Sequence, residues 1–272
     1  MDEEEIGMSN IMRNIGNHTR LASPSPWKEK PLGGLDAMNL RLLALGLMLL
    51  DHMWATIVPG NMWMTYVGRL AFPIFAFQVT EGFFHTSDRK KYMKRLLLFG
   101  LLAEVPFDFM MVSAPIFIFH QNVMFTLALG LWMIGSLEHF RGERTLRQGL
   151  KTAGVLALAS VLSVVGFVDY GIMGVWTVVI FYLCRGVSWA WVAQLVAMVL
   201  LNIVWFKGES LVFMLAGREI WFPTQGFAVL SLLLIWLYNG QKGSYGKSMQ
   251  QFSYWFYPVH MMLLHMIRIG WM

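Results

Sequence analysis

The sequence predicts an all-α, polytopic integral membrane protein with about nine or ten transmembrane helices and a cytoplasmic N-terminus. Of its 272 residues, 57% are hydrophobic and only 14% are charged, whereas soluble domains carry about 25% charged residues. The mean hydropathy is +0.54. Apolar segments also recur along the chain, and about 18 or more apolar residues are enough to cross a bilayer.

Nine apolar segments follow one another after a polar N-terminal stretch. They lie at residues 40–58, 63–84, 95–112, 121–138, 151–167, 171–184, 187–205, 221–238 and 252–269. A tenth piece at Ser210–Ala216 is too short to cross alone and is expected to be short or re-entrant. Residues 1–35 open with acidic MDEEE, unlike a signal peptide, and are expected to form a mobile cytoplasmic tail before a membrane domain at 36–272.

The distribution of basic residues sets the orientation. With the N-terminus inside, 17 of the 21 lysines and arginines fall on the cytoplasmic side, as the positive-inside rule requires. The net charge of +5 does not indicate a nucleic-acid partner, because these residues sit in short loops between apolar segments. The one cysteine, Cys184, excludes an intramolecular disulfide and a multi-cysteine metal site.

Charged residues interrupt the first two apolar segments. Asp51 and His52 lie inside the first and Arg69 inside the second, and each such charge costs at least about 2.5–3.5 kcal/mol on insertion scales. Counted from the outer ends of the helices, His52 and Arg69 lie at matched depth. We expect His52 to act as a general base, with Asp51 turned towards Arg69 on the neighbouring helix. The alternative is a histidine that only packs between helices.

Arg69 has two compatible roles. It could neutralise Asp51 or a carboxylate of the third segment, or it could stabilise an oxyanion or bind an anionic ligand. Gly68 and Pro73 flank it, which predicts a bend in this helix.

Other polar groups fall in later segments. Glu104 and Asp108 are four residues apart and share a helix face, where they could carry protons or be structurally paired. Asn122 is a polar residue on the outer side, at the start of the fourth segment. His260, within YPVH, lies in the last segment. The sequence leaves open whether His52 or His260 is the base.

A basic run, DRKKYMKR, joins the second and third segments on the inner side. Lys90, Lys91, Lys94 and Arg95 could hold the phosphates of an anionic cytoplasmic ligand such as a nucleotide-type coenzyme, and Tyr92 offers a ring for adenine. Glu81 lies on the same inner rim. The alternatives are a plain positive-inside loop or a contact with anionic lipid. The chain has no Walker-type phosphate loop.

Together these residues resemble the TraX family, which is named for the pilin N-acetylase of conjugative plasmids. The matching pieces are MLLDH at 48–52, GRLAFPIFAF at 68–77, EGFFHTSDRKKYMKRL at 81–96, PF at 106–107, NVMFTLALG at 122–130, DYGIMGV at 169–175 and FYPVHMMLLH at 256–265. The resemblance extends from about residue 36 to residue 268.

The resemblance implies a membrane acyltransferase of the bacterial inner membrane that uses cytoplasmic acetyl-CoA. On this hypothesis the basic run binds the coenzyme, and His52 takes a proton from the amine or hydroxyl of an extracytoplasmic peptide or glycan acceptor. Arg69 or Asn122 would stabilise the oxyanion. A covalent acetyl-histidine is a variant of this mechanism.

Two other classes of protein fit the same residues. In a proton-coupled transporter, Asp51, Arg69, Glu104 and Asp108 would form the ion path. The absence of two related halves in the sequence counts modestly against it. In a membrane scaffold, every buried charge would be structurally paired.

Overall fold

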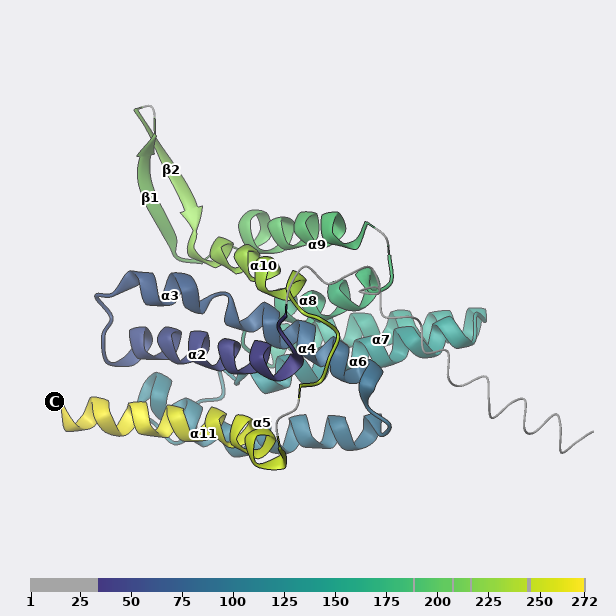
Figure 1. The fold of residues 1–272 in the computed structure, drawn as a ribbon, viewed down its shortest axis with the longest axis horizontal. Helices are drawn as coiled ribbons and strands as arrows, with labels where there is room; N and C mark the ends of the chain where they lie inside the picture. Colours follow the sequence, from purple (N-terminus) through teal and green to yellow (C-terminus); the bar gives the residue numbers. More distant parts are fainter. Residues whose placement is uncertain (1–33, 188, 207, 216, 244–245, 272) are drawn as a thin grey trace, which may run out of the picture.

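A computed structural model describes residues 34–187, 189–206, 208–215, 217–243 and 246–271. This part of the chain is mostly helical (Figure 1), as predicted. Nearly all of the expected tail, residues 1–33, lies outside the described residues, so the prediction made for it stays untested.

The elements follow the apolar segments closely. In chain order they are α2 (Ala37–Thr56), α3 (Met62–Gly68), α4 (Ala71–His85), α5 (Arg89–Val112), α6 (Val123–Gly142), α7 (Leu146–Val165), α8 (Gly171–Cys184), α9 (Ala190–Val199), the π-helical η2 (Leu200–Trp205), β1 (Ser210–Leu215), β2 (Arg218–Pro223), the 3₁₀-helical η3 (Thr224–Leu230), α10 (Ser231–Trp236) and α11 (Lys247–Gly270).

Polar side chains fix where several helices begin. Asp36, Asp88, Asn122 and Thr145 each stand at an N-cap and accept a hydrogen bond from a backbone N–H in the first turn. Such caps satisfy N–H groups that have no partner within the helix. They set the starts of α2, α5, α6 and α7.

The second predicted span is broken into two helices. The α3 helix ends at Gly68 and α4 starts at Ala71, so Arg69 lies in the break. Pro73 is the third residue of α4, where a missing N–H costs no helical hydrogen bond. The predicted bend is therefore confirmed, and it falls at the charged residue.

The described residues of the predicted tenth piece are not helical, although the described part of the chain as a whole is mostly helical. Residues Ser210–Leu215 form β1, which pairs antiparallel with β2 in a register that places Val212 opposite Trp221. Valine and aromatic residues favour strands, a preference that the apolar pattern alone did not reveal. The hairpin projects from the helical body (Figure 1). It also takes the first residues of the predicted span 221–238, whose α-helical part is only α10.

The C-terminal helix lies beside the first described one. A cluster of buried apolar residues joins α2, α4, α5 and α11, with Met48, Ala71, Phe107 and Met261 among its members. A larger cluster lies between α2, α4, α6 and α8. The α11 helix packs against both α2 and α5, and its contacts with α2 bring together side chains that are about 200 positions apart in the sequence.

The surface and the helices are apolar enough to indicate membrane association. By length and composition, α6 and α7 could each cross a membrane, and the three apolar stretches Gly171–Cys184, Ala190–Trp205 and Thr224–Trp236 are shorter. Large apolar side chains such as Leu101, Val161 and Val204 are more than half exposed. The nine-span topology itself stays a prediction.

Candidate active site

Asp51 and Arg69 form an ion pair between α2 and the break after α3, as the sequence predicted. One guanidinium nitrogen of Arg69 lies 3.6 Å from Asp51 Oδ1 and donates a hydrogen bond of 2.9 Å to Thr65 Oγ1. Thr65 in turn donates to Asp51 Oδ1 at 2.7 Å. The Nε of Arg69 is buried and has no hydrogen-bond partner among the described residues. Arg69 Nε is therefore a buried donor that has no acceptor within the described part of the chain.

His52 and His260, the two histidines between which the sequence did not decide, are in direct contact. His52 Nδ1 lies 2.7 Å from His260 Nε2, and the two rings lie edge to edge in nearly parallel planes with centroids 5.0 Å apart. The other nitrogen of His260, Nδ1, lies 2.7 Å from the backbone carbonyl oxygen of Phe256. We call His52 and His260 the histidine pair.

A small cavity of about 30 Å³ lies beside the histidine pair. Its walls come from α2, the α3–α4 break, α6, the start of α8 and α11. They are Met48, Asp51, His52, Gly68, Ala71, Phe72, Phe75, Val123, Asp169, Tyr170 and Tyr257. This space holds about one or two water molecules. His52 and Asp51 thus line the same small cavity from adjacent positions on α2.

Asn122 is committed to structural hydrogen bonds. Its side-chain amide donates to the Gly100 carbonyl at 2.8 Å and to Glu104 Oε2, and its Oδ1 accepts from Met124 N at 3.0 Å. Both amide hydrogens are in use, so the structure gives no geometric support to Asn122 as an oxyanion donor. Asn122 caps α6 and ties it to α5.

Glu104 and Asp108 point to separate partners and not to arginine. Glu104 bonds with Asn122, and Asp108 Oδ2 accepts from the Phe117 backbone N–H at 2.8 Å. Neither carboxylate has an ion pair among the described residues.

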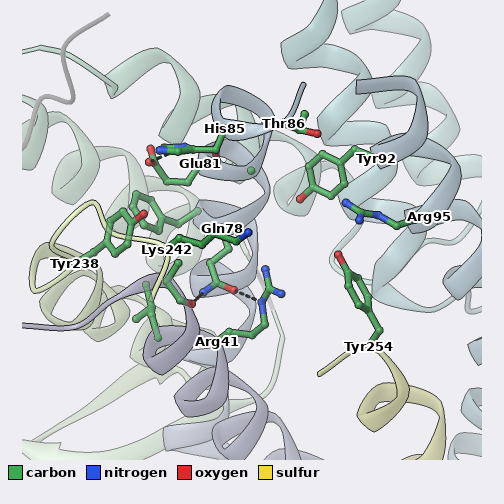
Figure 2. A pocket seen from close by; sticks show the side chains of 14 residues that line it. Arg41, Gln78, Glu81, His85, Thr86, Tyr92, Arg95, Tyr238, Lys242 and Tyr254 are labelled. Atoms are coloured by element: carbon green, nitrogen blue, oxygen red, sulfur yellow. Dashed lines mark hydrogen bonds and ion pairs between the residues drawn. The ribbon is translucent and has the colours of Figure 1, made fainter. Parts of the chain in front are cut away.

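A second, larger pocket opens at the other end of α2 and α4. It has a volume of about 270 Å³, and we call it the inner-rim pocket. Its walls are Ala37, Leu40, Arg41, Phe77, Gln78, Glu81, Gly82, His85, Thr86, Tyr92, Arg95, Tyr238, Lys242 and Tyr254. Figure 2 shows that the side chains of Arg41, Tyr92, Arg95 and Tyr254 point towards one another across this space.

Two guanidinium groups give the inner-rim pocket its charge. Arg95 lies over the rings of Tyr92 and Tyr254, 5.6 Å from each centroid, and Arg41 lies 5.9 Å from that of Tyr254. Arg41 Nε donates to Gln78 Oε1 at 3.4 Å. Arg95 Nε is buried without a hydrogen-bond partner, and within the described part of the chain neither arginine pairs with a carboxylate. Cations left without a counter-charge in a pocket favour an anionic ligand.

The predicted coenzyme residues separate into two groups. Tyr92, Arg95 and Glu81 line the inner-rim pocket, whereas Lys90, Lys91 and Lys94 are exposed on the surface and do not line it. Glu81 is held by Arg185, whose Nε donates to Glu81 Oε1 at 2.8 Å, and both side chains are less than a tenth exposed. This ion pair gives Glu81 a structural role, because it links α4 to the end of α8.

The sequence reasoning missed Arg41, Gln78, Lys242 and Tyr254. None of these four residues is among the candidate site residues predicted from the sequence. They reach the pocket from α2, α4, the loop before α11 and α11 itself. The available signal was a basic or polar residue at the inner end of several apolar segments.

Comparison with known proteins places the chain in a family. The family model described as TraX protein matches residues 37–268. The chain belongs to the TraX family. It is also 32% identical over 250 residues to a probable fimbrial assembly protein FimC, serogroup H1, of Dichelobacter nodosus, a match that covers 84% of this chain and 94% of that relative. No solved structure matches.

Proposed function

We propose that this TraX-family protein is a multi-pass acetyltransferase that moves an acetyl group from cytoplasmic acetyl-CoA to an extracytoplasmic acceptor. The observation that carries the proposal is the presence of two sites along the same two helices. A pocket with unpaired guanidinium groups lies at one end of α2 and α4, and the small cavity that His52 lines lies towards the other end.

The inner-rim pocket suits the nucleotide end of coenzyme A. Arg41 and Arg95 provide planar donors for phosphate oxygens, and Tyr92 and Tyr254 provide aromatic surface for an adenine ring. The positive-inside rule puts this end of α2 on the cytoplasmic side, where acetyl-CoA is available.

The distance between the two sites suits an extended arm. Arg41 and His52 are 11 residues apart on one helix, which is about 16 Å along its axis. The two pockets share no lining residue. Leu45 lies between them on α2, and it packs in one apolar cluster with Met48 and Phe75, which form part of the wall of the small cavity. In this proposal these side chains move aside when the pantetheine arm enters.

The reaction is a direct transfer at His52. The acceptor's N–H or O–H gives its proton to the imidazole while its nitrogen or oxygen bonds to the acetyl carbonyl carbon. The free Nε–H of Arg69 stabilises the oxyanion that forms. The carbon–sulfur bond then breaks, and the coenzyme A thiolate takes the proton from the histidine.

The acceptor is a peptide or glycan on the outer side of the membrane. The relative named as a fimbrial assembly protein supports a surface-structure component. The outward position of His52 along α2 is consistent with an acceptor that arrives from outside.

Binding of acetyl-CoA to the purified protein in detergent tests the coenzyme site. We expect Arg41→Gln/Arg95→Gln to weaken binding at least tenfold, measured by calorimetry. Lys90→Gln/Lys94→Gln removes the same charge outside the pocket and is expected to leave binding nearly unchanged. A folded wild-type protein that does not bind acetyl-CoA would contradict the proposal and favour the proton-coupled transporter.

A further inference from the structure

The histidine pair has a feature that the proposed reaction does not require. His52 Nδ1 is 2.7 Å from His260 Nε2, so one of these two nitrogens must donate a hydrogen and the other accept it. Which atom of His52 is the base therefore depends on His260.

The backbone of α11 decides the direction of this hydrogen bond. A carbonyl oxygen only accepts hydrogen bonds, and His260 Nδ1 lies 2.7 Å from the Phe256 carbonyl. His260 Nδ1 must therefore carry the hydrogen. In a neutral ring the other nitrogen, Nε2, is then the acceptor.

The hydrogen bond between the two rings then determines which nitrogen of His52 carries the hydrogen. Since His260 Nε2 accepts, His52 Nδ1 donates, and the lone pair of a neutral His52 is left at Nε2. Among the described residues no hydrogen bond reaches His52 Nε2. His52 also lines the small cavity, together with Asp51, Tyr170 and Tyr257.

We infer that His260 is a positioning residue that locks His52 in its Nδ1–H tautomer and so leaves Nε2 as the basic atom. The lock consists of two consecutive hydrogen bonds: His260 Nδ1–H donates to the Phe256 carbonyl oxygen, and His52 Nδ1–H donates to His260 Nε2. It extends the proposed function, because it selects the histidine and the nitrogen that receive the acceptor's proton.

The packing around His260 holds the two rings in the geometry that the lock needs. The planes of the His52 and His260 rings differ by only 5°, and the rings meet edge to edge through the hydrogen bond. The Phe256 ring stacks on the face of His260 with centroids 4.8 Å apart. His260 is 4% exposed. The hydrogen bond that sets the tautomer is thus held away from competing water.

A nitrogen spectrum of the purified protein with ¹⁵N-labelled histidine tests the lock without any acetyl transfer. His52 signals are identified by their loss in His52→Gln. In the wild type we expect His52 Nδ1 to be protonated and Nε2 to be unprotonated. In His260→Leu, which has no acceptor, we expect His52 to shift towards the Nε2–H tautomer.

His260→Gln is the matched variant, because its side-chain oxygen can accept from His52 Nδ1. It should retain the wild-type tautomer and more activity than His260→Leu, with the KM for acetyl-CoA unchanged in both variants. The opposite tautomer in the wild type, or an unaltered tautomer in His260→Leu, would overturn the inference. Failure of acetyl-CoA to bind would contradict the proposed function and leave this tautomer result standing.

Discussion

Asp51 packs directly against Gly68, so closely that a Cβ on Gly68 would lie 2.4 Å from the Cβ of Asp51. No real pair of such atoms approaches that distance, so only glycine permits it. The contact brings the end of α3 onto α2, and the next residue after Gly68 is Arg69. The ion pair therefore depends on a missing side chain next to it.

Gly68→Ala should separate these helices. We expect a loss of about 1–3 kcal/mol of stability from overpacking, seen as a lower melting temperature in detergent, and a loss of acetyl transfer. Gly46→Ala, also on α2 but with open space around its added Cβ, is the control. Equal melting temperatures for the two variants would contradict this account.

Arg69→Lys tests the oxyanion role. Lysine keeps the positive charge beside Asp51 but lacks the Nε–H and the planar fork of arginine. We expect kcat for acetyl transfer to fall about a hundredfold while the Kd for acetyl-CoA stays unchanged, because the inner-rim pocket does not include residue 69. An unaltered kcat would show that Arg69 is only the counter-ion of Asp51.

Glu81→Gln tests the structural role of Glu81. Removing one charge of a buried pair costs about 3–5 kcal/mol, since the other charge is left buried and uncompensated. We expect a large drop in melting temperature, and Glu143→Gln serves as the control because its partner His139 lies 4.0 Å away and both are mostly exposed. A stable Glu81→Gln protein that binds acetyl-CoA poorly would instead support the direct coenzyme contact that the sequence suggested.

His120 predicts a pH dependence of stability. It lies in the loop before α6, 3.5 Å from Asp169 Oδ1, and the hydrogen bond to Asp169, with the nearby carboxylates, raises the pKa of His120 above its ordinary value. A raised histidine pKa adds stability that is fully present below about pH 6.5 and is lost as pH rises through the folded pKa.

His120→Gln should therefore lower the melting temperature at about pH 5.5 and have little effect at about pH 9. The pair is partly exposed, so the change should be about 1 kcal/mol or less. His139→Gln, whose ring is mostly exposed, provides the comparison. A deficit that is equal at both pH values would contradict the assignment.

The sequence predicted the helices and part of the site, for a physical reason in each case. Long apolar segments locate α2, α5, α6, α7 and α11, because burial or lipid contact dominates their energetics. The pairing of Asp51 with Arg69 followed from their depth on two helices joined by a short loop. Glycine and proline around Arg69 predicted the break between α3 and α4.

What the sequence did not reveal depends on contacts between distant segments. His52 and His260 are 208 positions apart, and helix depth alone does not say which faces meet. Arg41 and Tyr254 reach the inner-rim pocket from opposite ends of the chain for the same reason. The lysines of DRKKYMKR form a basic run that predicted a phosphate site. On α5, however, they face outwards, while Tyr92 and Arg95 face the pocket.

The most direct test of the account is acetyl transfer by the purified protein in lipid vesicles. Radiolabelled acetyl-CoA would be supplied with periplasmic extract as the source of acceptor, and labelled product would be compared for the wild type and His52→Ala. We predict labelling by the wild type and its loss in His52→Ala, with an unchanged Kd for acetyl-CoA. Labelling by His52→Ala at the wild-type rate would contradict the role of the histidine pair, and no labelling by a folded, acetyl-CoA-bound wild type would contradict the transferase itself.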